Sequence, residues 1–281
     1  MPLPPRRSLR LLFAVFAALA LSAATGTSTV LANHTQKVGP PNVMTALGDS
    51  ITRGFHTGTI LQDVPANSWA TGTNKDLDSH AQRLTIANPD RSHNHAASGA
   101  RVAGLASQVE VAVRARPDYV TVLIGANDAC APTEAAMTSV EEYTGAFNAA
   151  LNALVRGLPD VHILVLSVPD LARLWEVGRD HPEVRRVWDS YDICQSMLAD
   201  PTDTTAGAQA RRDRVRARIQ AYNAAMIAAC AGYTPHCRGD GNAVFNYRFD
   251  LEVVSPIDYW HPSEHGQATL AQVAWEAGFW S

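Results

Sequence analysis

The sequence predicts an α/β fold, a three-layer α/β/α sandwich built around a mostly parallel sheet. Short apolar runs alternate with longer segments whose apolar residues recur at helical spacing, which is the rhythm of a doubly wound sheet with right-handed crossovers. The run at 119–124 is almost continuously apolar, as expected for a parallel strand covered by helices on both faces. One such rhythm along 281 residues favours a single large domain.

The first strand is predicted at 43–47, where an apolar run ends in Gly48-Asp49-Ser50. A helix is expected to begin just after this turn. Four further segments then follow in order: a long polar loop, a weakly helical region, a turn of small and polar residues, and an amphipathic helix, at 53–67, 68–88, 93–100 and 102–116. We expect the polar loop to form one wall of a cleft.

The second half of the chain begins with strand 119–124, which ends in Gly125-Ala126-Asn127-Asp128. Beyond it the pattern predicts a helix, a strand, an irregular insertion, a basic helix, a last strand and a closing helix, at 140–158, 161–168, about 169–205, 206–231, 244–247 and 263–277. The insertion is either a lid or binding loop, or a segment whose aromatic residues fill a small core of its own. The arginines of the basic helix predict a solvated face, with a docking patch for anionic lipid as the alternative.

Residues 1–32 are predicted to be a signal peptide rather than part of the fold. Three arginines precede the apolar run 11–21, and small residues at 30–32 suit a signal peptidase. An uncleaved anchor is the alternative, but the run is shorter than the roughly 20 residues needed to span a bilayer. We therefore expect a secreted protein whose single domain occupies 33–281, without stable membrane insertion. The choice between Sec and Tat export stays open.

The net charge bears on possible partners, and the cysteines bear on disulfides and on thiol catalysis. A net charge of −4 gives no basic surface for neutralising phosphates, so nucleic acid is not an expected partner. Four cysteines in an exported chain favour two disulfides. Cys230 and Cys237 enclose a short, turn-rich segment, which leaves Cys130 and Cys194 as the second pair. A reactive thiol is the alternative, but no cysteine has an evident activating base beside it.

Several loops place chemically suitable groups at the carboxyl edge of the predicted sheet, where ligands bind in open α/β folds. Ser50 is a candidate nucleophile, with a helix N-cap as the alternative. Asp258 and His261 are three residues apart, so the carboxylate is able to orient the imidazole as a general base for Ser50. The Ser50 amide, the Gly99 amide and the Asn127 side chain are the candidate oxyanion donors.

These residues lie in four blocks, GDSIT, NHAASGA, GAND and DYWHP, at 48–52, 94–100, 125–128 and 258–262. In this order they resemble the GDSL or SGNH hydrolases, and the insertion with its cysteines looks most like the phospholipase B-like branch. The resemblance implies a flavodoxin-like, five-stranded sheet, Ser50 as nucleophile, Asp258 and His261 as its partners, and Gly99 and Asn127 as oxyanion donors. Ala96 and Gln267 depart from the pattern, since many members carry glycine and histidine there.

The resemblance implies a secreted serine hydrolase that cleaves carboxylic esters through an acyl-enzyme and needs neither metal nor organic cofactor. We expect a monomer that acts on a small-molecule or lipid ester, preferably fatty-acyl. Removal of acetyl groups from cell-wall or plant polysaccharide is the alternative within this chemistry. A metal-dependent phosphoesterase using Asp49, Asp128, Asp258 and His261 and a non-catalytic exported binding module are the alternatives outside it.

Overall fold

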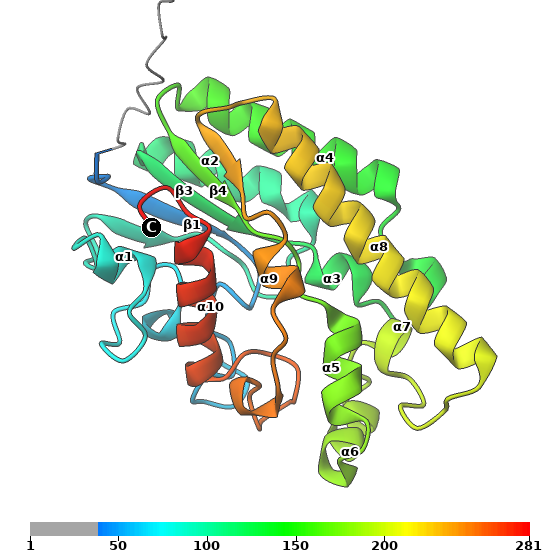
Figure 1. The fold of residues 1–281 in the computed structure, drawn as a ribbon. Helices are drawn as coiled ribbons and strands as arrows, with labels where there is room; N and C mark the ends of the chain where they lie inside the picture. Colours follow the sequence, from blue (N-terminus) through cyan, green and yellow to red (C-terminus); the bar gives the residue numbers. More distant parts are fainter. Residues whose placement is uncertain (1–38) are drawn as a thin grey trace, which may run out of the picture. The chain divides into compact units, whose positions relative to one another are not determined.

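A five-stranded, all-parallel sheet forms the centre of the protein, in a computed structural model that describes residues 39–281 (Figure 1). The predicted signal peptide and its cleavage site lie outside the described residues. The strands run in the order β2-β1-β3-β4-β5, with bounds Ser92–Asn94, Met44–Gly48, Tyr119–Leu123, His162–Val165 and Cys237–Gly239. The predicted fold class is confirmed.

Helices cover both faces of this sheet (Figure 1). One layer contains α2 (Leu105–Ala115), α4 (Val140–Gly157) and α8 (Ala206–Ala231), which pack side by side. The other contains α1 (His80–Arg83) and α10 (Glu264–Glu276). Every residue of β1 and β3 is buried, because the two helical layers exclude water from both faces of the sheet. No helix within 39–281 is long and apolar enough to cross a bilayer.

Shorter helices occupy the connections. The α-helices among them are α3, α5, α6, α7 and α9, at Ala126–Ala129, Leu171–Gly178, Pro182–Ser190, Gln195–Leu198 and Ala243–Asn246. The 3-10 helices η1, η2, η3 and η4 lie at Pro65–Asn67, Val102–Gly104, Glu134–Ala136 and Leu251–Val253. The predicted insertion is therefore helical, built from α5, α6 and α7, and the description of it as irregular was wrong.

Three further sequence predictions were wrong in local detail. Residues 244–247 lie largely in helix α9, and the last strand is β5 instead. Strand β2 occupies part of the segment predicted as a turn at 93–100. No helix follows Ser50, because residues 50–56 form turns. Elements of three or four residues contain at most two periods of a strand and about one turn of a helix, so their apolar pattern does not discriminate between the two.

Candidate active site

Ser50 lies in a turn at the carboxyl end of β1. Gly48, two residues earlier, has a φ of 149°, and a Cβ there would collide with the Leu123 carbonyl of β3. Only glycine fits this close approach of the two strands. The Phe55 amide donates to the Ser50 carbonyl at 3.1 Å and closes the turn. The nucleophile candidate is therefore fixed to the central strands of the sheet.

Three side chains from the two ends of the chain meet at this turn. His261 Nε2 lies 2.8 Å from Ser50 Oγ, and His261 Nδ1 lies 2.5 Å from Asp258 Oδ2. Asp258 Oδ1 accepts the backbone amides of Trp260 at 3.0 Å and His261 at 3.1 Å. Burial raises the pKa of Asp258, but the hydrogen bonds and charge of His261 outweigh burial and lower this pKa to about 2. The carboxylate is therefore ionised at neutral pH and accepts a proton-donating imidazole nitrogen.

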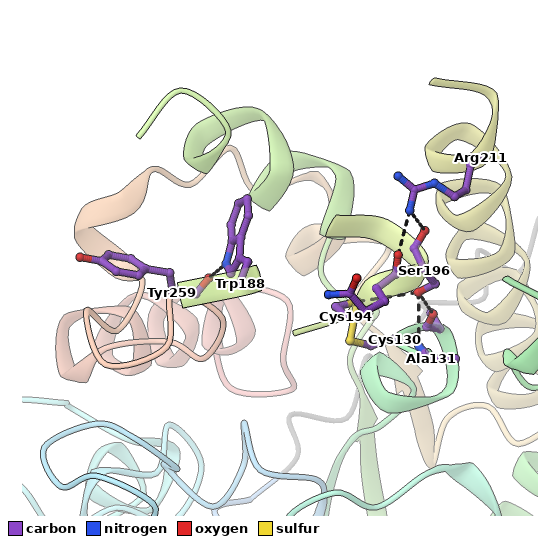
Figure 2. The surroundings of a disulfide bond; sticks show 9 residues. Cys130, Ala131, Trp188, Cys194, Ser196, Arg211 and Tyr259 are labelled. Atoms are coloured by element: carbon purple, nitrogen blue, oxygen red, sulfur yellow. Dashed lines mark hydrogen bonds between the residues drawn. A yellow bond between two sulfur atoms is a disulfide. The ribbon is translucent and has the colours of Figure 1, made fainter. Parts of the chain in front are cut away.

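The loop that carries Asp258 and His261 is held in place at several points. The Ser255 amide donates to the His261 carbonyl at 2.8 Å, and the Tyr259 amide donates to the Ser255 carbonyl at 2.9 Å. Tyr259 itself has a φ of 50°. Its carbonyl accepts the indole Nε1 of Trp188 at 2.9 Å, so helix α6 of the insertion contacts this loop directly (Figure 2).

Gln267 connects α10 to the Ser50 turn. Its side chain is fully buried, donating through Nε2 to the Ile51 carbonyl at 2.7 Å and accepting the Trp69 amide through Oε1 at 2.9 Å. Both ends of the side-chain amide are thus hydrogen-bonded to backbone groups. A side chain that is both a donor and an acceptor is needed to make these two bonds. The sequence singled out this residue only as a departure from the branch pattern, and its positioning role was missed.

The structure brings Gly99 and Asn127 to the same edge of the sheet. The Ala97 amide donates to the Gly48 carbonyl at 3.1 Å. This bond holds the loop that contains Gly99 beside the carboxyl end of β1. Gly99 has a φ of 79°. Asn127 Nδ2 donates to the Ala100 carbonyl at 3.0 Å, and this nitrogen carries a second N–H. The arrangement is compatible with the predicted oxyanion donors, whose roles remain a prediction.

Asn94, the first residue of the second block, has a structural task. Its Nδ2 donates to the Thr52 carbonyl at 2.8 Å, and lies 3.0 Å from Thr71 Oγ1 and 3.3 Å from Ser68 Oγ. It therefore ties strand β2 to the turn that follows Ser50. The last residue of the third block, Asp128, is occupied in the same way, because its carboxylate accepts a backbone amide at 2.9 Å and a threonine hydroxyl at 2.7 Å.

These contacts do not favour the metal-dependent alternative. Within 39–281, the one group of histidines and carboxylates close enough to share an ion is His56, Asp258 and His261. Its members already bond to one another, because His56 and His261 each contact Asp258 Oδ2 through Nδ1. Asp49 and Asp128, two of the four ligands that the sequence suggested, lie outside this group. The four ligands of the phosphoesterase alternative therefore do not form one group among residues 39–281.

Asp49 is buried directly beside the nucleophile. Its Oδ1 accepts the Ile51 amide at 3.0 Å, whereas Oδ2 is buried without a hydrogen-bond partner among the described residues. Burial raises the pKa of this carboxyl group from 3.8 to about 7, opposed by the Ile51 hydrogen bond and by the charge of His261. Near pH 7 Asp49 is thus partly protonated and adds less than a full negative charge to the site.

The structure contains both predicted disulfides, Cys130–Cys194 and Cys230–Cys237. The first joins Cys194 of the insertion to Cys130 (Figure 2), which stands three residues after Asn127 in the chain. Beside it, Ser196 Oγ donates to the Ala129 carbonyl at 2.8 Å. The insertion is therefore bound to the site region by one covalent bond and by hydrogen bonds.

The basic face of α8 is not simply solvated, which corrects the sequence prediction. Each of its five arginines bonds to another part of the chain, through Arg211, Arg212, Arg214, Arg216 and Arg218. Arg211 donates to the carbonyls of Gln195 and Ala199 (2.8 and 2.7 Å), and Arg216 pairs with the buried Asp170 at 2.8 Å. Most of these contacts hold the insertion, so these arginines have structural partners as well as solvent around them.

His56 is the residue that sequence reasoning missed most clearly. Its Nδ1 lies 2.7 Å from Asp258 Oδ2, the same oxygen that His261 contacts. The two residues are 202 positions apart in the chain. Neither a spacing nor a motif identifies such a contact, because it depends on how the loop at 53–67 folds over the end of the sheet.

Comparisons with known proteins give the family of the chain and relatives of its fold. A model of the GDSL-like lipase/acylhydrolase family matches residues 46–269. The acetylxylan esterase Axe2 from Geobacillus stearothermophilus is 16% identical, with 86% of this chain and 95% of that chain covered and a TM-score of 0.51. An α/β hydrolase, LAE5, from the metagenome of Lake Arreo is 18% identical, with 84% and 94% covered and a TM-score of 0.50. A search of curated proteins finds no match.

Proposed function

Since this chain belongs to the GDSL-like lipase/acylhydrolase family and is a carboxylic ester hydrolase, we propose that it cleaves its substrate through an acyl-enzyme on Ser50. His261 is the general base, and Asp258 orients it. The observation that carries the proposal is the unbroken chain of contacts from Ser50 Oγ to His261 and on to Asp258, at 2.8 and 2.5 Å.

The reaction proceeds in two halves. Ser50 Oγ attacks the ester carbonyl while its proton moves to His261 Nε2, and the Nδ1–H of His261 stays bonded to Asp258. The Ser50 and Gly99 amides and the Asn127 side chain stabilise the resulting oxyanion. The tetrahedral intermediate collapses, and His261 returns the proton to the leaving alcohol. Water then attacks the acyl-enzyme with His261 again as base, which releases the acid and restores Ser50.

Replacement of the nucleophile is the direct test. We expect Ser50→Ala to lower turnover by about 10⁴-fold or more while leaving the melting temperature nearly unchanged, because it removes the hydroxyl that His261 Nε2 contacts. Ser107→Ala, which alters an exposed serine of α2, is the matched control and should retain full activity. A Ser50→Ala variant with a tenth of the original rate would contradict the proposal.

Covalent labelling distinguishes this enzyme from a non-catalytic binding module. A fluorophosphonate probe reacts with a serine hydroxyl only when a neighbouring base activates it. We expect one probe per molecule on the unaltered protein, and none on Ser50→Ala or His261→Ala. Absence of labelling on the unaltered protein would favour the binding module instead.

An apolar cavity supports a hydrophobic acyl group as the substrate. The cavity measures about 100 Å³, and its walls include Ile51, Leu174, Trp260, Pro262 and Leu270. Ile51 follows Ser50 in the chain, and Trp260 and Pro262 flank His261. An aliphatic chain that leaves water for such walls gains about 0.8 kcal/mol for each methylene buried. We propose fatty-acyl esters, with phospholipids of the predicted phospholipase B-like branch among them.

A series of p-nitrophenyl esters from acetate to palmitate tests the acyl preference. We expect kcat/KM to rise from acetate to a chain of intermediate length, because each added methylene contributes burial until the cavity is full. The alternative is an acetyl esterase, which the name of the fold relative Axe2 suggests. Activity confined to acetate and propionate would favour that alternative and leave the Ser50 mechanism untouched.

We propose that the protein is exported and acts outside the cell. Two disulfides persist in an oxidising compartment and are rare in the cytosol, and the predicted signal peptide at 1–32 supplies the route. Expression of the full chain should place active enzyme in the medium. Deletion of 1–32 should retain it inside the cell, and secretion of both forms would contradict the assignment of that segment.

A further inference from the structure

One carboxylate oxygen in the site serves two imidazoles. Asp258 Oδ2 lies 2.5 Å from Nδ1 of His261 and 2.7 Å from Nδ1 of His56. The rings of the two histidines meet edge to face, with centroids 5.7 Å apart. Both side chains are buried, so water does not compete freely for either contact. The mechanism proposed above uses only one of these imidazoles.

The positions of the protons follow from the contacts. An ionised carboxylate is a hydrogen-bond acceptor only, so each imidazole must donate its Nδ1–H to Asp258. A neutral imidazole that donates through Nδ1 accepts through Nε2. In His261 this nitrogen faces Ser50 Oγ, whereas in His56 it is buried without a hydrogen-bond partner among the described residues. Among the described residues, the bond that His56 Nδ1 donates to Asp258 is therefore the one hydrogen bond of this imidazole.

The backbone around His56 is built to hold that ring. His56 has a φ of 59°, which side-chain-bearing residues rarely adopt. Its carbonyl accepts Ser255 Oγ at 2.7 Å, and the Ser255 amide in turn donates to the His261 carbonyl. The turn after Ser50 is thus joined to the catalytic loop through the ring and through the main chain. A backbone conformation of this kind persists only where surrounding contacts enforce it.

We propose that His56 is a positioning residue for the hydrolysis, a second donor that fixes the Asp258 carboxylate so that Oδ2 faces His261. The inference rests on the proposed function of the Ser50 site. Two backbone amides hold Oδ1, and His56 donates to the other oxygen, Oδ2, which His261 also contacts. Without this donor the contact with His261 alone fixes the position of Oδ2, and the base loses part of its orientation at the moment it accepts the serine proton.

Two substitutions separate the donated bond from the bulk of the ring. His56→Leu keeps an apolar side chain but removes the donor. His56→Asn carries an amide N–H near the position of Nδ1 and is able to restore the bond. We expect His56→Leu to lower kcat for a soluble p-nitrophenyl ester about tenfold to a hundredfold, the range for losing a hydrogen bond to a charged group, with KM changed less than about twofold. His56→Asn should recover most of kcat.

A third variant keeps the test decisive if His56→Leu does not fold. His56→Gln has the same polarity as His56→Asn but carries its amide near the position of Nε2, so it should lose kcat as His56→Leu does. The matched control is His265→Leu, an exposed histidine of α10, which should have full activity. Equal kcat in the Asn and Gln variants, or a loss confined to KM, would overturn the proposal.

The nucleophile Ser50 and the positioning residue His56 are tested by different measurements. Fluorophosphonate labelling of Ser50 measures the nucleophile, and the His56 variants should still be labelled completely, only more slowly. If Ser50→Ala is active, the proposed function fails whatever His56 does. If Ser50→Ala is inactive and His56→Leu retains full kcat, the proposed function stands and the positioning role of His56 is wrong.

Discussion

The buried carboxyl group of Asp49 makes the stability of the protein depend on pH in a direction opposite to that of most carboxylates. Burial raises its pKa from 3.8 in the unfolded chain to about 7 in the folded protein. Well below pH 4 the carboxyl group is protonated in both states, so its ionisation does not change the free energy of unfolding. As pH rises from 4 to 7 the unfolded chain releases the proton and the folded protein keeps it, so folding becomes progressively less favourable.

The size of this effect follows from the two pKa values. Each pH unit between them contributes about 1.4 kcal/mol, so the full difference is about 4 kcal/mol as an upper limit. Asp49→Asn removes the titrating group and keeps an oxygen for the Ile51 amide. We therefore expect the variant to gain free energy of unfolding relative to the original protein, by about 2 to 3 kcal/mol more at pH 7 than at pH 5.

Urea denaturation at 25 °C and pH 5, 6, 7 and 8, with both disulfides intact, measures this difference. Asp90→Asn, which replaces an exposed carboxylate, is the control, and its effect should stay within about 0.5 kcal/mol at every pH. The decisive quantity is the slope against pH rather than the absolute stability. A difference between Asp49→Asn and the original protein that is constant from pH 5 to pH 8 would refute the reasoning.

Two further predictions concern the oxyanion site and the insertion. Asn127→Ala should lower turnover by about 10²–10³-fold with little change in KM; if the side chain serves only to hold Ala100, the melting temperature falls instead and turnover per folded molecule is unchanged. Arg212→Met should destabilise the protein by about 3 kcal/mol, because this buried guanidinium donates to two backbone carbonyls. Arg214→Met, which breaks an exposed pair, should cost less than about 1 kcal/mol in the same denaturation assay.

The long elements of the fold were predictable because they contain many periods of a pattern. The helix predicted at 206–231 coincides with α8, and the strand predicted at 119–124 differs from β3 by one residue. The edge strands β2 and β5 have three residues each. Their place in the sheet is decided by hydrogen bonds to the neighbouring strand, which the local sequence does not encode.

Part of the site was predictable because its reactive residues stand in short sequence motifs. Ser50, Asp258 and His261 stand in loops at the sheet edge, and the fold brings those loops together. His56 and Gln267 act through contacts with segments about 200 residues away, and a single histidine or glutamine in a polar stretch has no distinguishing pattern. Finding them required the structure, because burial and partner geometry are properties of the folded chain.

The insertion at about 169–205 is either a mobile lid or a fixed part of the fold. Its contacts favour a fixed part of the fold. A lid must open without breaking strong bonds, since such segments belong to the least stable parts of a protein. Here a disulfide joins the insertion to Cys130, and Arg211 bonds to its carbonyls. Trp188 donates to the carbonyl of Tyr259, between Asp258 and His261. Displacing α6 would thus break a hydrogen bond that supports the catalytic loop. Opening of this segment would therefore disturb the position of His261, the general base.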